Sequence, residues 1–317
     1  MAKYLFFTDA HVKGKNPASR TDNYYASWML KFGELLMLAK KHKVDAIIDG
    51  GDLLDIPIVA DSIVDDILDA IESAGIPFYV CWGNHPMIGH HKETSKGSTL
   101  SHMFRRCKLF KDIGGGEEVG KDYSIDFVDY DHNIEEKLKT EGIIRPENKA
   151  NKDYWKIAIV HAFVTPKPFL PTVLHVVAND IKTNMDLVLV GHYHKPWTKK
   201  IGKTTFLDIG CFGRCKSDEA DIEPSVLLLD TDKRSYEIIK LETAKKGSEV
   251  FDLSKKEHSE YMNEDLETFI ASLKDFKSQE TDLRGMIEHI GREQNIDRTI
   301  VEIVLNKLGE IDVQKTS

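Results

Sequence analysis

Five short clusters of Asp, Asn and His residues each follow an apolar run of the chain. In sequence order they are Asp9-Ala10-His11, Gly50-Gly51-Asp52, Gly83-Asn84-His85, His161 and Gly191-His192-Tyr193-His194. Carboxylate, amide and imidazole groups in combination suit Mn²⁺, Fe²⁺ or Zn²⁺ better than Ca²⁺ or Mg²⁺ alone. The glycines let the chain turn sharply and bring its backbone close to a bound ion. The pattern therefore predicts a metal site with ligands from five separate segments.

Taken singly, most of these clusters are weak signals. An Asp-x-His or a Gly-Asp pair occurs by chance in many loops, and a lone histidine such as His161 is typical of a buried side chain with a local partner. Gly-Asn-His and Gly-His-x-His after an apolar run are more specific. All five clusters in this order, each ending a predicted strand, favour a centre that holds two metal ions.

The apolar runs before the clusters are predicted to be buried strands, and amphipathic helices alternate with them. The expected strands are 4–7, 46–48, 78–82, 157–160 and 187–190, and the expected helices are 24–40, 63–71 and 94–106. This alternation indicates an α/β fold with parallel strands. Because the carboxyl ends of parallel strands lie at one edge of a sheet, the five clusters are expected to meet in one crevice.

Length and composition limit the class of protein. The chain has 317 residues, which predicts about two domains at ~150 residues each. No apolar run approaches the ~18 residues of a membrane span, and the first residues are too short for a signal peptide, so we expect a cytoplasmic protein. The four cysteines form no Cys-x-x-Cys pair, which fits a reducing compartment. The net charge of −9 argues against a protein that merely coats nucleic acid, but it does not exclude a nuclease.

The five clusters together resemble the calcineurin-like metallophosphoesterase superfamily. The resemblance implies an α/β fold, namely a four-layer αββα sandwich with a small β-rich cap and a helical C-terminal tail. It implies two divalent ions, Mn²⁺ first, with Fe²⁺, Zn²⁺ or Mg²⁺ as alternatives, that activate water for attack on a phosphoester. One ion would be held by Asp9, His11, Asp52 and His194. Asp52 would bridge to the second ion, whose other ligands would be Asn84, His161 and His192.

The same resemblance gives roles to two further residues. His85 would face the scissile phosphate as a general acid or transition-state stabiliser. Asp55 would pair with His85 and fix its tautomer, although a surface Asp that caps a turn is the plain alternative. The family usually has an acidic residue after Gly-Asn-His, whereas this chain has Pro86, which puts the orientation of His85 in question.

Within the superfamily, the chain looks most like SbcD-type DNA repair exonucleases, including short phage-encoded versions. Ile56-Pro57 stands where a protein phosphatase would have Arg-Gly, which argues against that class. The resemblance implies a DNA substrate and a possible SbcC-type ATPase partner, while a homodimer stays open. A phage-encoded protein would act in the host cytoplasm. The alternatives are a small-molecule phosphodiesterase and a non-catalytic scaffold.

Basic residues follow two of the ligand clusters, where they would rim the crevice. Phosphate contacts are predicted for Lys13, Lys15, Arg20, Lys199, Lys200 and Arg214. Trp197 is predicted to stack on an unpaired base. The plain alternative is a set of solvated surface lysines with Trp197 packed beneath them.

Three regions are expected along the chain. Residues 1–210 would form the dimetal phosphoesterase domain, and residues 211–250 would complete the sheet and form the small cap. Residues 251–317 would be helical and would dock a partner or pack on the catalytic domain.

Overall fold

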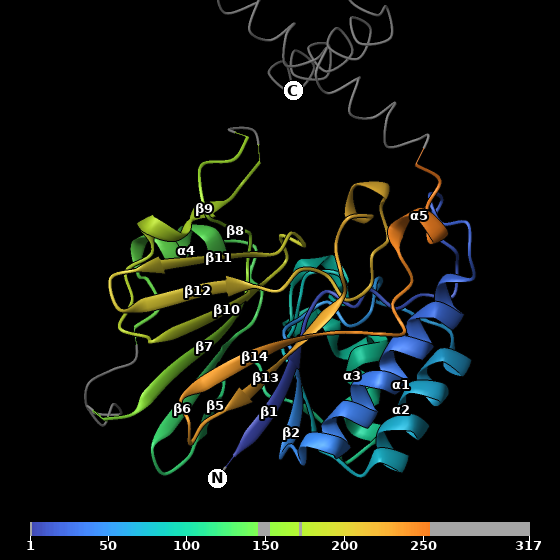
Figure 1. Cartoon of the computed structure of the whole chain (residues 1–317), viewed down its shortest axis with the longest axis horizontal. Helices are drawn as coiled ribbons and strands as arrows, with labels where there is room; N and C mark the ends of the chain where they lie inside the picture. Colours follow the sequence, from blue (N-terminus) through green and yellow to red (C-terminus); the bar gives the residue numbers. More distant parts are fainter. Residues whose placement is uncertain (1, 145–152, 171–172, 254–317) are drawn as a thin grey trace, which may run out of the picture. The chain divides into compact units, whose positions relative to one another are not determined.

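The computed structural model describes residues 2–144, 153–170 and 173–253, which contain two six-stranded sheets and a two-stranded ribbon (Figure 1). The strands of the first sheet are β1 (Lys3–Phe7), β2 (Ala46–Asp49), β3 (Phe78–Val80), β4 (Phe110–Asp112), β13 (Ser225–Asp230) and β14 (Ser235–Lys240). Those of the second sheet are β5 (Glu117–Val119), β6 (Tyr123–Val128), β7 (Trp155–His161), β10 (Leu187–Gly191), β11 (Trp197–Ile201) and β12 (Thr204–Asp208). The ribbon pairs β8 (Val164–Thr165) with β9 (Val176–Val177).

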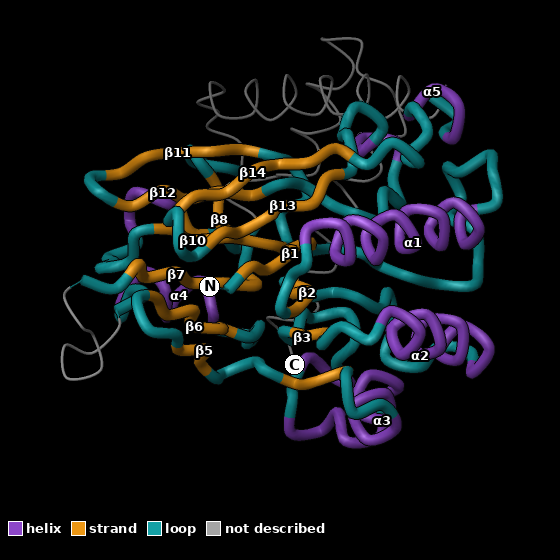
Figure 2. Tube along the Cα trace, turned by 60° about the horizontal axis from the view of Figure 1, so that its bottom comes forward, coloured by secondary structure: helices purple, strands orange, loops and turns teal. Residues whose placement is uncertain are grey.

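The layers follow the order expected from the sequence, α-β-β-α. The helices are α1 (Tyr24–His42), α2 (Asp61–Ala74), α3 (Thr99–Arg106), α4 (Ile134–Thr140) and α5 (Gly247–Val250). Figures 1 and 2 show α1, α2 and α3 beside the first sheet, and α4 beside the second. The strand orders are β14-β13-β1-β2-β3-β4 and β11-β12-β10-β7-β6-β5. The strands predicted beyond Gly191 therefore all join the two large sheets.

Three apolar cores hold these layers together. In β1, Tyr4 and Phe6 point into the core between the sheets, whereas Leu5 and Phe7 point toward α1, α2 and α3. The outer face of the second sheet packs against α4, through Ile134 among others. Strands buried on both faces read as continuous apolar runs, which explains why the sequence pattern revealed them.

Local signals explain where the helices begin and end. Asn23 caps α1, because its side chain accepts a hydrogen bond from the Ala26 N–H at 3.0 Å. Gly75 ends α2 in the left-handed conformation, with φ of 70°. The helix predicted over 94–106 is interrupted, because the Ser98 side chain caps a new helix, α3, after a short 3₁₀ turn. A capping serine inside an apolar pattern is easily missed.

Strand register brings the carboxyl ends of the parallel strands level with one another. In the first sheet Phe7 lies beside Asp49, and Asp49 lies beside Val80. In the second sheet His161, the last residue of β7, lies beside Gly191, the last residue of β10. The loops that leave these five strands thus start at the edges of two sheets, whereas the strand pattern predicted one edge of a single sheet.

In the part of the chain that the structure describes, no helix is long and apolar enough to cross a bilayer. The region predicted to be helical, 251–317, lies outside the described residues from residue 254 onward. The domain boundaries at residues 210 and 250 stay a prediction.

Candidate metal centre

The loops after β1 and β2 are tied together by backbone hydrogen bonds. The Asp9 N–H donates to the Gly51 carbonyl at 3.0 Å, and the His11 N–H donates to the Asp52 carbonyl at 2.8 Å. Asp9, His11 and Asp52 are all buried. Two short connections of the first sheet therefore present their polar side chains at one fixed place.

The second sheet contributes its own ligands to the same place. The backbone N–H of His192, just after β10, reaches both carboxylate oxygens of Asp9, at 3.1 and 3.0 Å. His161 is fully buried, and its Nδ1 donates to the Gly50 carbonyl at 3.0 Å, which leaves Nε2 as the free ring nitrogen. Predicted ligands thus make the hydrogen bonds that join the edges of the two sheets.

Most of the predicted ligands have an unusual backbone conformation. Five of them have a positive φ: Asp9 (53°), His11 (45°), Asp52 (58°), His192 (96°) and His194 (68°). A non-glycine residue in this region costs on the order of 1–3 kcal/mol and persists only where the surrounding structure imposes it. The concentration of such residues here marks these loops as a functional site.

Glycines admit the close approach between the loops. A Cβ atom on Gly51, where φ is 116°, would lie 2.2 Å from the Nδ1 atom of His161. A Cβ atom on Gly83 would lie 2.1 Å from the Oδ1 atom of Asp52. At both positions a side chain larger than that of glycine would push the predicted ligands apart.

Asp9, His11 and His194 form one group that can hold a metal ion. Their ligand atoms all lie within 4.8 Å of one another. The Nε2 atom of His194 is 3.4 Å from the Oδ1 atom of Asp9 and 3.0 Å from the Nε2 atom of His11. This is the set predicted for the first ion, apart from the bridging carboxylate.

Asp52, His161 and His192 form a second group of the same kind. The Nε2 atom of His161 is 3.2 Å from the Oδ2 atom of Asp52, and the Nε2 atom of His11 lies 3.9 Å from that same oxygen. The Asp52 carboxylate therefore lies between the two groups. Its position is the one that a bridging ligand requires.

The chemistry of the donor atoms fits a pair of cations. Within the described residues, Asp52 Oδ2, Asn84 Oδ1 and His161 Nε2 are buried side-chain atoms without a hydrogen-bond partner. Burying such an atom without a partner is costly. All three belong to the set predicted for the second ion, and Asp52 Oδ2 and His161 Nε2, 3.2 Å apart, are close enough for one cation to satisfy both.

The charges at the site also favour bound cations. Burial opposes ionisation of Asp9 and Asp52, but His194 and His161, respectively, hold the pKa of each carboxyl below its usual range. Burial lowers the pKa of His161, but Asp52 more than offsets this effect and raises it to about 9. Burial lowers the pKa of His192 to about 3, so its imidazole is neutral and free to act as a ligand. Two ionised carboxylates thus attract positive charge between them.

Residues 2–196 match the family model for calcineurin-like phosphoesterases. The chain belongs to this family. Its members are hydrolases that act on phosphoester bonds and use a dimetal centre, and the Asp and His groups described above can bind metal ions.

Three curated relatives are archaeal proteins named "DNA double-strand break repair protein Mre11". The one from Halobacterium salinarum is 26% identical over 239 residues, which is 70% of this chain and 54% of the relative. Those from Methanosarcina mazei and Methanosarcina acetivorans are 28% and 27% identical, over 63% and 54% of this chain. The chain thus spans about half the length of the first relative, and 30% and 27% of the lengths of the other two.

Solved structures with a similar fold are distant in sequence. The protein TT1561 of Thermus thermophilus has a TM-score of 0.44 at 15% identity, over 76% of this chain and 99% of that one. Yfce, a phosphoesterase from E. coli, has a TM-score of 0.37 at 13% identity, over 75% of this chain and 99% of that one.

In this phosphoesterase, Asp55 contacts His85 by a different atom from the one expected. The Nδ1–H of His85 donates to the backbone carbonyl of Asp55 at 2.8 Å, whereas the Asp55 carboxylate lies 3.9 Å away. That carboxylate lies nearer to His11 Nδ1, at 3.4 Å, and accepts a hydrogen bond from Lys13 at 2.8 Å. Burial opposes ionisation of Asp55, but His11 and Lys13 bring its pKa down to about 2. The carbonyl fixes the tautomer of His85, and the carboxylate orients the predicted ligand His11.

Glu219 is a functional residue that the sequence reasoning missed. It is buried, and its Oε1 accepts a hydrogen bond from the Nδ1–H of His194 at 2.7 Å. Its Oε2 accepts hydrogen bonds from the backbone N–H groups of Cys215 and Lys216, at 2.5 and 3.0 Å. Burial opposes ionisation of Glu219, but the bond from His194 brings its pKa down to about 2. An ionised Glu219 holds the His194 ring with Nε2 turned to the metal centre.

We therefore expect Glu219→Gln to weaken metal binding by about 10- to 100-fold, the usual effect of removing a carboxylate behind a histidine ligand. Competition with a chromogenic chelator measures the change. Asp218→Asn is the matched control, because it removes the same charge from the adjacent residue without touching His194. An equal loss in both variants would mean that charge alone, and not the bond to His194, sets the affinity.

Two of the predicted phosphate contacts are wrong. Arg20 is 7% exposed, hydrogen-bonds Asp22 at 2.8 Å through both Nε and Nη2, and stacks on the Phe251 ring. Arg214 is 3% exposed and donates to the carbonyls of Ile222 and Lys245. Both guanidinium groups are occupied by internal contacts, so neither can hold a DNA phosphate.

The remaining basic residues and Trp197 are only partly available. Lys13 is paired with Asp55, the ammonium of Lys199 donates to the Pro166 carbonyl, and Trp197 packs against the core beneath the outer face of the second sheet. Lys15 and Lys200 are exposed. The stacking role predicted for Trp197 is therefore not supported, and the structure favours the alternative, in which Trp197 packs beneath surface residues.

A pocket of about 390 Å³ opens beside the metal-binding groups. Its lining includes three histidines and three aromatic residues together with four charged residues. These residues are His85, His192, His194, Phe163, Phe169, Tyr193, Lys195, Lys216, Asp218 and Glu219. Lys195 and Lys216, which were not among the predicted phosphate contacts, thus line this pocket.

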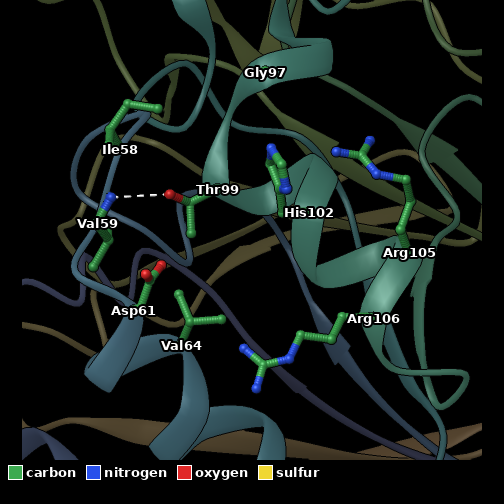
Figure 3. Close-up of a pocket in the computed structure, with 9 residues that line it drawn as sticks. All are labelled: Ile58, Val59, Asp61, Val64, Gly97, Thr99, His102, Arg105 and Arg106. Atoms are coloured by element: carbon green, nitrogen blue, oxygen red, sulfur yellow. Dashed lines mark hydrogen bonds between the residues drawn. The ribbon is translucent and has the colours of Figure 1, made fainter.

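A second pocket, of about 440 Å³, lies away from the predicted ligands between α2 and α3 (Figure 3). Its lining includes His102, Arg105 and Arg106, and all three are exposed. Arg106 pairs with Asp65 at 2.5 Å. None of the seven predicted ligands lines this pocket.

Proposed function

We propose that this phosphoesterase is a metal-dependent DNA exonuclease of the SbcD and Mre11 type. The observation that carries the proposal is the position of Asp52 between the groups Asp9–His11–His194 and His161–His192, next to an open pocket. The names of the three archaeal relatives support DNA as the substrate. Two divalent ions, Mn²⁺ first, are the proposed cofactors.

The residues of the chain have distinct roles in this reaction. When bound, the two ions polarise the phosphoryl oxygens and lower the pKa of water. His85 lines the pocket, and the side chain is 40% exposed, so its Nε2 can reach a substrate while Nδ1 stays bound to Asp55. We assign His85 the protonation of the leaving oxygen or the stabilisation of charge on the phosphoryl group. Lys195 and Lys216 bind the neighbouring backbone phosphates.

The proposed partners are an SbcC-type ATPase and a second copy of the chain. The proposed location is the cytoplasm, which would be that of a host cell if the protein is phage-encoded. The printed names of the relatives speak of DNA double-strand break repair, so the partners and the location rest on the resemblance to SbcD-type nucleases. Pull-down with a purified SbcC-type ATPase, and mass measurement by light scattering, test them directly.

Cleavage of defined DNA tests the proposed activity. We expect 5′- and 3′-labelled oligonucleotides to lose single nucleotides from one end, faster with Mn²⁺ than with Mg²⁺. Hydrolysis of bis-p-nitrophenyl phosphate runs in parallel as a substrate that is not DNA. Hydrolysis of the small ester without attack on DNA would favour a small-molecule phosphodiesterase. Inactivity on both, with two metals bound, would favour a non-catalytic scaffold.

The double variant Lys195→Glu with Lys216→Glu is expected to weaken DNA cleavage and to lower the slope of log(kcat/KM) against log[salt] by about two, one for each lost phosphate contact. Rates measured at several salt concentrations give the slope. The matched control is the double variant Lys203→Glu with Lys233→Glu, which reverses two exposed charges outside the pocket. An unchanged slope in the first double variant would remove the phosphate-binding role of its two lysines.

A further inference from the structure

Three aromatic side chains line the pocket beside the metal-binding groups. Phe163 comes two residues after His161, Tyr193 stands between His192 and His194, and Phe169 follows on the segment between β8 and β9. We call Phe163, Phe169 and Tyr193 the aromatic cluster. A site that handles only phosphate and metal ions needs no such apolar wall.

The rings of the aromatic cluster support one another. The ring centroids of Phe163 and Phe169 are 5.5 Å apart, those of Phe163 and Tyr193 are 5.2 Å apart, and those of Phe169 and Tyr193 are 5.8 Å apart. The two contacts of Tyr193 are edge-to-face, with interplanar angles of 64° and 79°. Edge-to-face packing fixes the rings but leaves part of their faces uncovered.

The aromatic cluster is not part of a hydrophobic core. All three rings are half-buried, and none belongs to the three cores that hold the described layers together. Trp197, by contrast, does pack on such a core. The partly exposed ring surfaces therefore face the pocket and not the interior.

The aromatic cluster lies directly against the predicted ligands. The Phe163 ring centroid is 5.5 Å from that of His192. Lys195 and Lys216 line the same pocket and supply positive charge. Apolar ring faces, basic groups and a metal centre within one pocket match the parts of a nucleotide, which are a flat base and phosphate groups.

We propose that the aromatic cluster is a base-stacking subsite, which holds the unpaired base of the nucleotide next to the phosphodiester being cleaved. This inference rests on the proposed nuclease function and narrows its substrate class. A base within a duplex is stacked between its neighbours and cannot enter a pocket of about 390 Å³ without leaving the helix. The favoured substrates are therefore single strands and frayed ends, and blunt paired ends are cleaved more slowly.

A cycle of variants and substrates tests the subsite. Phe169 is the residue to change, because its ring packs on Phe163, His175 and Tyr193, none of which is a predicted metal ligand. Phe169→Leu keeps an apolar side chain but removes the ring, and Phe169→Tyr keeps the ring. Each is assayed on a single-stranded oligonucleotide and on the same strand with a tetrahydrofuran abasic residue at the cleaved end. Leu170→Ala is the matched control, because Leu170 is the next residue, is 48% exposed and does not line the pocket.

On the normal strand, Phe169→Leu is expected to raise KM about tenfold, and Phe169→Tyr is expected to restore most of the loss. The abasic residue should raise the KM of the wild type by a similar factor. On the abasic strand, the KM of Phe169→Leu should be little higher than that of the wild type, because both changes remove the same stacking contact. A blunt duplex should be cleaved more slowly than the same duplex with mismatched ends.

Two outcomes overturn the subsite. If the increases in KM from Phe169→Leu and from the abasic residue multiply, then Phe169 supports the local structure and does not contact the base. If the wild type cleaves blunt and frayed ends equally, no unpaired base is needed. Failure of the nuclease function itself would look different, because the wild type would then hydrolyse bis-p-nitrophenyl phosphate and leave every DNA intact.

Discussion

Asp52→Asn is expected to reduce phosphodiester hydrolysis by about 10³-fold or more, to the level of background. The Asp52 carboxylate lies between the two metal-binding groups, 3.2 Å from His161 Nε2 and 3.9 Å from His11 Nε2. An amide has one oxygen and no charge, so it cannot bridge two cations. Metal ions supply several kcal/mol of transition-state stabilisation, and each ~1.36 kcal/mol is a factor of ten in rate. Rates of bis-p-nitrophenyl phosphate hydrolysis and metal content by elemental analysis measure the loss.

Asn is the right replacement because Asp52 has a φ of 58°, a conformation that Asn adopts readily. The matched control is Asp49→Asn, three residues earlier. Asp49 is fully buried, neither of its carboxylate oxygens has a hydrogen-bond partner among the described residues, and burial raises the pKa of its carboxyl well above the usual range. Burial favours the neutral form of this carboxyl, and an amide is neutral and of similar shape, so Asp49→Asn should retain activity within a few-fold. Full activity of Asp52→Asn would end the two-metal mechanism.

The predicted ligands could be read from the sequence because each stands at the end of an apolar strand. Parallel strands carry their C-terminal residues to one edge, so Asp9, Asp52 and His192 meet although the chain separates them widely. The strand pattern also indicated the α/β fold with parallel strands, while the arrangement in two sheets followed from the family resemblance. Short edge strands such as β5, exposed along most of its length, carry no apolar pattern and were not predicted.

The supporting residues could not be read in the same way. Glu219 lies 25 residues after His194 on a short 3₁₀ turn, and nothing local marks it as the partner of that histidine. Arg20 and Arg214 looked like free basic groups because sequence shows charge but not burial. Their carbonyl and carboxylate partners include groups from distant turns of the fold. Contacts between loops that lie far apart in the sequence can be identified only once the structure shows how the loops pack.

The aromatic cluster was only partly predictable from the sequence. Phe163 and Tyr193 are within two residues of predicted ligands, and this adjacency was a usable signal. Trp197 was chosen instead because basic residues flank it. The structure places Phe163 and Tyr193 in the lining of the pocket, whereas Trp197, on β11, does not line it and packs against a core.

His85→Gln is expected to keep both metals and to lower kcat by about 10²-fold or more, the usual effect of removing a positioned acid or stabilising donor. His85 and the predicted ligands His11 and Asp52 also form a group whose ligand atoms lie within 4.8 Å, so a role as a ligand must be tested. Its Nδ1 is bound to the Asp55 carbonyl, its backbone N–H donates to Asp52 Oδ1 at 2.9 Å, and its ring lines the pocket. These contacts aim Nε2 at the substrate side.

Two measurements separate a role in chemistry from a role in metal retention. Elemental analysis gives the number of metals in His85→Gln, and kcat for bis-p-nitrophenyl phosphate gives the loss in rate. We expect two metals and a lower kcat, because Gln can donate a hydrogen bond but cannot transfer a proton as an imidazole does. His11→Gln is the contrasting variant, since it should lose metal. If His85→Gln also binds one metal fewer, then His85 is a ligand, and another group must protonate the leaving oxygen.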